Sequence, residues 1–267
     1  MTPTTPRIAE LTAPAAWRMV DFISDLHLQA SEPATVAAWE HYMAHTRANA
    51  VFILGDLFEV WVGDDVLDAN DAETPFEAHC AHILRTTAQR CAVFFMHGNR
   101  DFLLGTAFAQ ACGLQLLTDP TALVFGGQRW LLTHGDALCL DDTDYLQFRI
   151  QVRSPEWQAT FLARPLAERR TIARGLRAQS EARKRSGAVY ADVDAAAARH
   201  WLQAAQAREL IHGHTHKPAD HALSPDLQRR VLSDWDAAAT PPRAEVLRLQ
   251  LDAGAVQVQR LATSQAV

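Results

Sequence analysis

Short apolar runs recur along the chain, each followed by polar residues and then by a segment of helical periodicity. The runs are rich in β-branched and aromatic residues and are continuous rather than alternating, as in strands that are buried on both faces of a sheet. Alternation of such strands with helices predicts an α/β fold. The five runs that precede polar clusters are residues 20–23, 51–54, 93–96, 130–132 and 210–211.

Helical patterns occupy the intervals between the first of these runs, and we predict that Ser31 caps the first helix. The alternation stops after His134, where an Arg-rich helical stretch continues to about residue 206. We interpret residues 143–206 as a helical lid inserted into the domain. The three earlier helices are predicted over residues 33–47, 74–90 and 102–111.

The last part of the chain, after residue 216, has partly alternating segments that predict antiparallel strands of a second sheet. Residues 19–267 therefore form one domain that contains the lid. Residues 1–18 form an N-terminal extension, for which the sequence leaves order or disorder open. The three late strands are predicted near residues 229–235, 243–251 and 256–261.

Length and composition narrow the class of protein. The chain has 267 residues, 48% of them hydrophobic, which is enough for one large, well-buried core. Its formal net charge of -6 argues against nucleic acid as a partner. Residues 149–187, however, hold ten Lys and Arg against three Glu, a local charge of +7 that leaves -13 on the remainder. The lid is thus basic although the protein is acidic.

The four cysteines form no C-x-x-C pair and stand within or beside apolar stretches, as reduced core thiols commonly do. This usage indicates a reducing compartment. Residues 1–18 lack the apolar run of a secretory signal, and the chain contains no eighteen consecutive apolar residues. We therefore expect a protein that is soluble or peripheral to a membrane.

Polar clusters follow all five apolar runs directly. Open α/β sheets place their sites beyond the carboxyl ends of the strands, so these loops are expected to converge on one crevice. A lone His after a strand is usually a surface or core histidine, and a Gly-Asp pair is usually a turn. Five such clusters in register favour a common site. They contain Asp25 and His27, Gly55 and Asp56, Gly98 to Asp101, His134 to Asp136, and His212 to His216.

The residue types and their spacing suit metal ions. Residues at i and i+2 in extended chain face the same way, so Asp25 and His27 can reach a common side, as can His214 and His216. His212 has the same i, i+2 spacing relative to His214, and strand geometry alone does not decide whether His212 is a ligand or a neighbouring histidine that binds no metal. Carboxylate, imidazole and amide donors suit Mn, Fe, Zn or Mg. The seven candidate ligands are Asp25, His27, Asp56, Asn99, His134, His214 and His216.

Seven candidate ligands favour two metal ions over one. Asp56 is the only ligand in its cluster, which makes it the natural bridging carboxylate. Two cations about 3.5–4 Å apart can activate a water and stabilise charge on a phosphoryl oxygen. The predicted chemistry is hydrolysis of a phosphoester or pyrophosphate bond.

These clusters resemble the calcineurin-like metallophosphoesterases, whose pattern is D-x-H, G-D, G-N-H/R-D/E, H and G-H-x-H, in this order. The matches extend from about residue 20 to residue 220. The resemblance implies a four-layer α/β/β/α fold. It further implies one metal at Asp25, His27, Asp56 and His216, and another at Asp56, Asn99, His134 and His214. Arg100 stands where many members have a His, and because Arg keeps its proton it should grip phosphate as a fixed cation.

Longer motifs resemble more closely the UDP-2,3-diacylglucosamine pyrophosphohydrolases of lipid A biosynthesis, in which Arg is usual at the position of Arg100. The resemblance implies hydrolysis to UMP and 2,3-diacylglucosamine 1-phosphate, commonly with Mn. It also implies substrate contacts at Asn99, Arg100, Asp142, Ser180, Lys184 and His214. Lys184 is an offset match, because the family's Lys aligns with Gly187, and Arg185 is the other candidate. The motifs are S-D-L-H-L from residue 24, G-D-L-F-E-x-W-x-G-D-D from 55, H-G-N-R-D-F-L-L-G from 97, H-G-D-x-L-C-x-D-D from 134 and I-H-G-H-T-H-x-P from 211.

This resemblance gives the lid two interpretations. Apolar residues from Trp157 to Leu176 recur at roughly helical spacing, with arginines such as Arg169, Arg170 and Arg174 among them. The segment is either an ordinary amphipathic hairpin or a lid that holds two acyl chains and presents a basic surface to anionic phospholipid. The second interpretation implies a monomer at the cytoplasmic face of the inner membrane.

Two rival functions remain open at this point. A soluble phosphodiesterase or nucleotide pyrophosphatase of the same superfamily would have no need of an apolar, basic lid. A non-catalytic scaffold of the same fold would be expected to have lost metal ligands, and this chain retains all seven.

Overall fold

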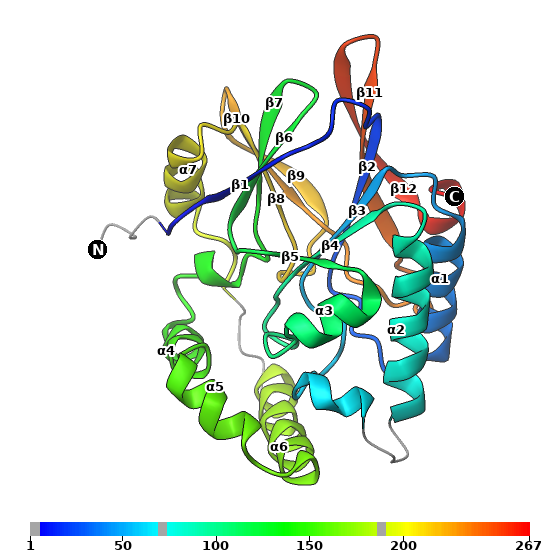
Figure 1. The fold of residues 1–267 in the computed structure, drawn as a ribbon. Helices are drawn as coiled ribbons and strands as arrows, with labels where there is room; N and C mark the ends of the chain where they lie inside the picture. Colours follow the sequence, from blue (N-terminus) through cyan, green and yellow to red (C-terminus); the bar gives the residue numbers. More distant parts are fainter. Residues whose placement is uncertain (1–5, 69–73, 186–190) are drawn as a thin grey trace.

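The structure is a computed structural model that describes residues 6–68, 74–185 and 191–267, without the side chains of residues 74 and 179–185. Figure 1 shows two β-sheets side by side, with helices on their outer sides and further helices at one end. The strands are β1 (Ala9–Thr12), β2 (Met19–Ile23), β3 (Ala50–Leu54), β4 (Ala92–Met96), β5 (Gln115–Leu117), β6 (Thr121–Phe125), β7 (Gln128–Leu132), β8 (Glu209–His212), β9 (Ala219–Ser224), β10 (Leu227–Val231), β11 (Glu245–Asp252) and β12 (Ala255–Ala262). The helices are α1 (Pro33–His45), α2 (Thr74–Ala88), α3 (Thr106–Cys112), α4 (Thr143–Val152), α5 (Pro155–Leu162), α6 (Leu166–Arg185) and α7 (Ala195–Ala204), with short 3-10 turns at Asp64–Leu67, Asp136–Leu138 and Thr263–Gln265.

Each sheet has six strands. The first sheet has the order β12-β11-β2-β3-β4-β5, and the second has β1-β6-β7-β8-β10-β9. Strands β2 to β5 are parallel, as are β7 and β8, so their carboxyl ends lie at the same edge of their sheets. All five predicted functional loops follow these parallel strands.

Side chains alternate between two cores along the strands of the first sheet. In β3, Phe52 and Leu54 pack between the two sheets, while Val51 and Ile53 pack under the helices. The opposite face of the second sheet packs against α7, where Leu210 meets Trp201. Burial on both faces explains why the strands read as continuous apolar runs. The layers are α/β/β/α, which confirms the predicted fold.

Several elements differ from the sequence-based expectation. Strands β11 and β12 extend the first sheet through antiparallel pairing with β2, whereas β9 and β10 belong to the second sheet. Residues 9–12, within the predicted extension, form β1 in parallel register with β6. Helix α1 begins after Glu32 with a Pro at its first turn and no side-chain cap, so the prediction of Ser31 as N-cap is wrong.

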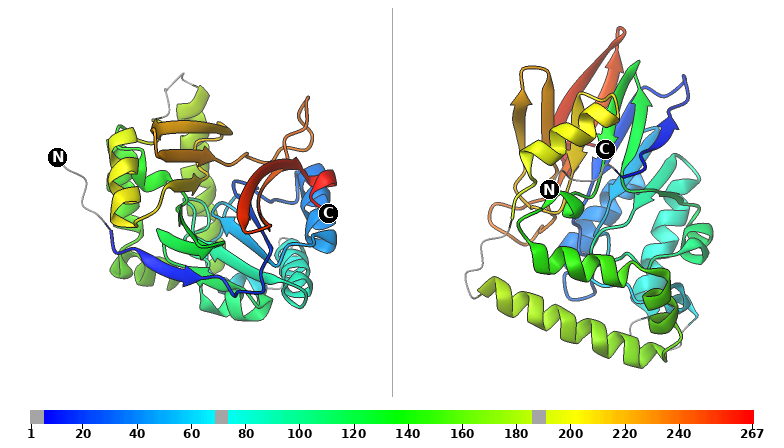
Figure 2. Two further views of the ribbon diagram at one scale, coloured as in Figure 1. Left: turned by 90° about the horizontal axis from the view of Figure 1, so that it is seen from above. Right: turned by 90° about the vertical axis from the view of Figure 1, so that its left-hand side faces the viewer.

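Helices α4, α5 and α6, residues 143–185, form what we term the cap. Figures 1 and 2 show the cap at one end of the molecule, below both sheets, while α7 lies against the second sheet. Arg169 of α6 is 2% exposed, and its guanidinium binds the Val62 carbonyl and the Asp65 carboxylate. Arg170 is also buried and lies 3.5 Å from Glu77. These two arginines fasten the cap to the core, so the expectation that they form a basic outer surface is wrong.

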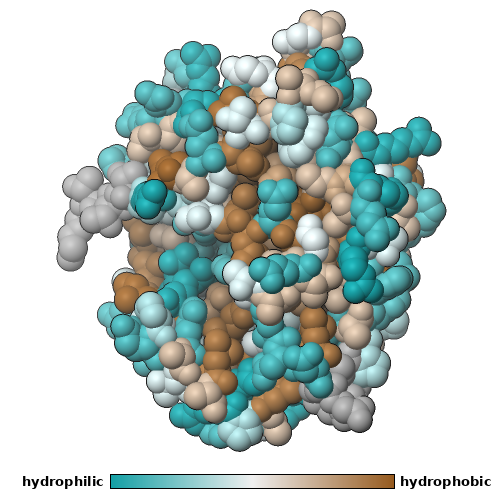
Figure 3. Space-filling view, in the orientation of Figure 1, coloured by the Kyte–Doolittle hydropathy of each residue, from teal (hydrophilic) through white to brown (hydrophobic). Residues whose placement is uncertain are grey.

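The cap carries the exposed large apolar side chains of the described chain. They are Phe148 and Ile150 on α4, Leu162 on α5 and Leu176 on α6, and Ile150 is 73% exposed. Phe161, by contrast, is buried and stacks on Trp157. In Figure 3, apolar surface appears between hydrophilic side chains over this end of the molecule. Among the described helices, none combines the length and apolarity needed to cross a bilayer.

Candidate metal centre

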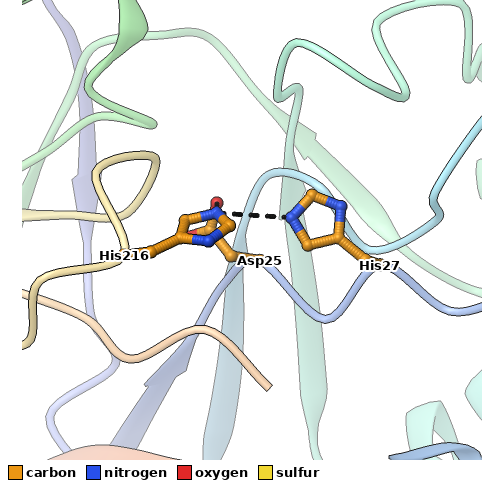
Figure 4. Close-up of side chains that lie close together, drawn as sticks. All are labelled: Asp25, His27 and His216. Atoms are coloured by element: carbon orange, nitrogen blue, oxygen red, sulfur yellow. Dashed lines mark hydrogen bonds and ion pairs between the residues drawn. The ribbon is translucent and has the colours of Figure 1, made fainter. Parts of the chain in front are cut away.

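The predicted ligands meet where the two sheets adjoin. Asp25 and His27 follow β2, Asp56 follows β3, and Asn99 follows β4 of the first sheet. His134 follows β7, and His214 and His216 follow β8 of the second sheet. Figure 4 shows Asp25, His27 and His216 facing one another across this junction. The structure thus brings all seven candidate ligands into one cluster.

One half of the cluster contains two imidazoles and two carboxylates. His27 Nε2 lies 3.4 Å from His216 Nε2, and His216 Nε2 lies 3.3 Å from Asp25 Oδ1. Asp56 Oδ2 completes this half at 3.9 Å from His27 Nε2. These are the four residues that the family resemblance assigns to one metal.

The other half centres on the Asn99 amide oxygen. This oxygen lies 3.0 Å from His134 Nε2 and 2.9 Å from His214 Nδ1. His134 Nδ1 lies 2.9 Å from the Leu54 carbonyl. In the tautomer with the proton on Nδ1, this nitrogen donates to the carbonyl and Nε2 has a lone pair available for a metal. Asp56 Oδ1 stands 3.9 Å from the same Nε2. Asp56 therefore directs one oxygen to each half, as a bridging ligand must.

Asp25 also connects the two halves. Its ligand oxygen lies within 4.8 Å of ligand atoms of His27 and His216, and likewise of Asp56 and His134. The backbone amide of His214 donates to both oxygens of Asp25, at 3.1 and 2.9 Å. The Ser24 hydroxyl donates to Oδ2 at 2.6 Å. These donors fix the orientation of the carboxylate.

The backbone is strained at the same positions. Among the described residues other than glycine, seven have positive φ, and five of them are predicted ligands. A left-handed backbone costs about 1–3 kcal/mol at such residues and persists where the surroundings impose it. This concentration of strain indicates that the loops are shaped for ligand placement. The five are Asp25, His27, Asp56, His214 and His216, with φ between 48° and 67°.

Two glycines allow the loops to approach so closely. A Cβ at Gly98 would stand 2.0 Å from Asp56 Oδ1, and a Cβ at Gly55 would stand 2.5 Å from His134 Nδ1. Gly55 also has a φ of +91°, which side chains rarely adopt. Both glycines are therefore required for space, and Gly55 is also required for its backbone conformation.

The electrostatics of the cluster favour bound cations. Burial alone would raise the pKa of Asp25, but His216, His134 and His27 hold it well below its usual range. Burial alone would lower the pKa of His134, yet the carboxylates of Asp56, Asp25 and Asp136 raise it to about 9. Burial and the neighbouring His134 lower the pKa of His214 to about 4. The buried carboxylates thus require positive charge nearby. The imidazoles supply it in this structure, and a bound cation would supply it as well.

The donor set fits divalent cations. Asp25 and Asp56 are buried, and among the described residues neither forms an ion pair with Lys or Arg. Nitrogen and oxygen lone pairs face one another across the cluster at 3.3–3.9 Å. Imidazole, carboxylate and amide donors in this arrangement suit Mn, Fe, Zn or Mg. A cation would replace the proton that His134 otherwise holds.

Sequence reasoning missed three supporting residues. Asp101 accepts backbone hydrogen bonds from Gly98 at 2.9 Å and Leu57 at 2.7 Å, which joins two ligand loops. Burial and the neighbouring Asp56 carboxylate raise the pKa of Asp101 to about 7. Asp101 stands in the G-N-R-D motif and Glu59 in G-D-L-F-E, so the motifs contained the signal. Asp234, 3.8 Å from His216 Nδ1, lies outside any motif.

Glu59 connects the centre to the cap. Its Oε2 lies 2.9 Å from His27 Nδ1, as an ion-pair contact without the alignment of a regular hydrogen bond. Its other oxygen, Oε1, pairs with Arg177 Nε of α6. A carboxylate on the outer nitrogen of a ligating His orients the ring and strengthens it as a ligand. Glu59 therefore joins α6 of the cap to the metal centre, and Tyr145 of α4 stacks on the ring of His214 with centroids 6.0 Å apart.

The remaining predicted residues have different positions. The Arg100 backbone amide donates to Asp56 Oδ1 at 2.8 Å, and its buried Nε has no hydrogen-bond partner. Asp142 is the N-cap of α4. The side chains of Ser180 and Lys184 lie outside the described residues. His212 is fully buried, with Nδ1 2.8 Å from the Gly213 carbonyl, and burial lowers its pKa to about 3, which marks a core histidine.

The four-layer fold and this cluster define a class of protein, and the comparisons agree with it. Residues 19–218 match the family model described as calcineurin-like phosphoesterase, so the chain belongs to that family. Within it, the chain is 47% identical to the UDP-2,3-diacylglucosamine hydrolase of Chromobacterium violaceum, over 81% of this chain and 90% of that protein. The proteins of the same name from Bordetella pertussis and Ralstonia nicotianae are 43% and 45% identical, over 86% of this chain and 90% and 89% of theirs. The chain therefore belongs, more narrowly, to the family of UDP-2,3-diacylglucosamine hydrolases, which confirms the predicted resemblance.

Proposed function

We propose that the protein hydrolyses the pyrophosphate bond of UDP-2,3-diacylglucosamine at the α-phosphorus. The products would be UMP and 2,3-diacylglucosamine 1-phosphate, in a step of lipid A biosynthesis. The observation that carries the proposal is the convergence of seven ligands from five loops, in a chain whose relatives are named for this substrate. Two Mn²⁺ ions are the proposed cofactors.

The chain's residues have distinct tasks in this reaction. Two divalent cations held by the seven ligands would supply a water of lowered pKa and stabilise charge on the phosphoryl oxygens. Arg100, whose Nε has no protein partner, would bind the pyrophosphate as a fixed cation with two-pronged geometry. Glu59 and the Leu54 carbonyl orient His27 and His134. Asp101 keeps the Asp56 and Asn99 loops in register.

The cap is the proposed site for the acyl chains. The cap adjoins the metal centre, because Arg177 of α6 pairs with Glu59. Its side chains Leu162 and Leu176 are exposed. Exposed apolar side chains on an element that borders a phosphate site suit a substrate that joins two acyl chains to a pyrophosphate. Because Arg169 and Arg170 are buried, contact with anionic phospholipid would depend on other cap residues, such as the exposed Arg174. We propose a monomer that is peripheral to the cytoplasmic face of the inner membrane.

Isotope labelling tests the reaction. The purified protein with Mn²⁺ would be incubated with UDP-2,3-diacylglucosamine in ¹⁸O-water, and both products analysed by mass spectrometry. Attack at the α-phosphorus places one ¹⁸O in UMP and none in the sugar phosphate. Asp56→Ala should lose turnover and metal content together, whereas the matched variant Asp252→Ala, at the exposed end of β11, should match the parent. Label in the sugar phosphate, or full turnover by Asp56→Ala, would contradict the proposal.

A lipid-free substrate separates this function from its rivals. A generic soluble phosphodiesterase would cleave bis(p-nitrophenyl) phosphate at least as efficiently as the diacylated substrate. The proposed enzyme would have a kcat/KM for the lipid that is larger by orders of magnitude, since each buried methylene contributes about 0.8 kcal/mol. A non-catalytic scaffold would cleave neither.

A further inference from the structure

A cavity with both polar and apolar lining residues lies beside the metal centre. It has a volume of about 470 Å³, and its lining includes His97, Asp119, Arg149 and Arg153. Strand β5 is parallel to β4, with Leu117 in register with Met96, so the residues after β5 emerge at the same edge as the Asn99 loop. Cavities of this size at the carboxyl end of a parallel sheet commonly hold small ligands.

The cavity shares a wall with the site of hydrolysis. Arg153 Nη2 donates to the Gly98 carbonyl at 2.8 Å, immediately before Asn99 and Arg100. His97, on the same loop, also lines the cavity. A molecule whose phosphates lie at Arg100 could therefore extend into the cavity past this loop.

A buried carboxylate without a well-aligned hydrogen bond lines the cavity. The Asp119 side chain is 6% exposed, and neither of its oxygens has a hydrogen-bond partner of good geometry. Arg149 Nη2 lies 4.0 Å from Oδ2. Burial and the neighbouring Asp136 raise the pKa of Asp119, against the opposing effect of the Thr133 hydroxyl and the two arginines. An unsatisfied buried carboxylate is costly, so a ligand that donates to it would be stabilised there.

The guanidinium groups of Arg149 and Arg153, which line the cavity with Asp119, are held in place by Asp136. Arg149 Nε donates to Asp136 Oδ2 at 2.7 Å, and Arg153 Nη2 lies 3.6 Å from the same oxygen. Both side chains also line the cavity. The cavity thus presents one carboxylate acceptor accompanied by two rigid groups of donors.

We propose that this cavity binds the uracil base of the substrate, an inference that rests on the proposed function. Uracil presents an acceptor, a donor and an acceptor along its O2, N3–H and O4 edge. The complement is a donor, an acceptor and a donor, which Arg149, Asp119 and Arg153 supply. Cytosine places an acceptor at N3, directly against the carboxylate, and is rejected because a buried polar group is then left unpaired.

Calorimetry of nucleoside monophosphates with the Mn-loaded protein tests the proposal. The parent should bind UMP at least about 10-fold more tightly than CMP. Asp119→Ala should reduce that ratio to near one, while the control Asp226→Ala, which removes an exposed carboxylate from the turn between β9 and β10, should retain it. Equal affinity of the parent for UMP and CMP, or an unchanged ratio in Asp119→Ala, overturns the proposal.

A second variant guards against misfolding. Asp119→Asn keeps the size of the side chain and one acceptor oxygen, so it should fold like the parent by thermal unfolding and show an intermediate ratio. The binding ratio also separates this proposal from the function on which it rests. A parent protein that fails to hydrolyse the diacylated substrate yet prefers UMP refutes the substrate and retains the base site. A parent that hydrolyses it without base preference refutes the base site alone.

Discussion

Gly98→Ala should damage the metal centre through a single methyl group. The new Cβ would lie 2.0 Å from Asp56 Oδ1 and 2.4 Å from the Asp56 amide nitrogen. Ordinary van der Waals contacts begin near 3.4 Å, so the Asp56 loop or the Gly98 loop must move by about 1 Å. Overpacking of this kind typically lowers the free energy of unfolding by about 1–3 kcal/mol. Metal sites tolerate deviations of about 0.2 Å in the metal–ligand distances, and a reacting group misplaced by 1 Å lowers the rate about 100-fold.

The assay has three readouts: urea unfolding, metal content by elemental analysis, and hydrolysis of the diacylated substrate. We expect Gly98→Ala to hold fewer than two metal ions per chain and to lose about 100-fold in kcat/KM. Gly127→Ala is the matched control, because its φ of +73° costs about 1 kcal/mol while nothing lies within 4 Å of the new Cβ. It should lose stability and keep activity. Full metal content and turnover in Gly98→Ala would refute the argument that close loop approach sets the ligand geometry.

Three further predictions follow from other parts of the structure. Arg100→Ala should lower kcat/KM for pyrophosphate cleavage more than Arg100→Lys, since Lys keeps the charge without the two-pronged grip; equal, parent-like activity in both would remove Arg100 from the reaction. Arg248→Met should cost about 3–5 kcal/mol in urea unfolding, because it strands the buried Asp21 carboxylate that Arg248 contacts at 2.7 and 2.8 Å, and a cost below about 1 kcal/mol would contradict this. Burial raises the pKa of Cys112 and Cys139 to about 12, so these thiols should resist a thiol reagent at pH 8 in the native state and react on unfolding. The stability linked to them is complete below the unfolded thiol pKa and declines as pH rises towards 12.

The pattern of the sequence predicted the strands that carry the site because those strands are buried on both faces. β3 and β4 are continuous apolar runs, β2 is an apolar run interrupted by Asp21, and each precedes a loop of candidate ligands. Two of the missed strands lack that signal, because β5 has three residues at a sheet edge and β9 is half exposed. β6 was also missed, although it is a largely buried run of the sequence TALVF. β11 alternates as expected, but alternation does not identify the partner strand, so its place beside β2 was not predictable.

The convergence of the candidate ligands was predictable from their positions after strands and their spacing, and their surroundings were not. Asp25 and His27 stand two residues apart after a strand, a relation visible in the chain itself. The Asp119 cavity depends on α4 lying across the end of β5, a contact between distant segments. Composition also misjudged Arg169, since a count of charges does not distinguish a cation on the surface from a buried one that binds a backbone carbonyl and a carboxylate.

The single carboxylate of Glu59 has a thermodynamic consequence for how the protein responds to its ligands. One of its oxygens contacts a residue of the metal centre, and the other contacts Arg177 of α6. With the acyl chains at the cap as proposed, a lipid that repositions α6 would change the support of His27. An ion bound at His27 would likewise change the contact of Glu59 with α6. Such a linkage is reciprocal, so bound lipid should change the affinity for metal by the same factor by which bound metal changes the affinity for the lipid. Binding of metal would then favour binding of the lipid, and the Glu59 side chain would couple the two events.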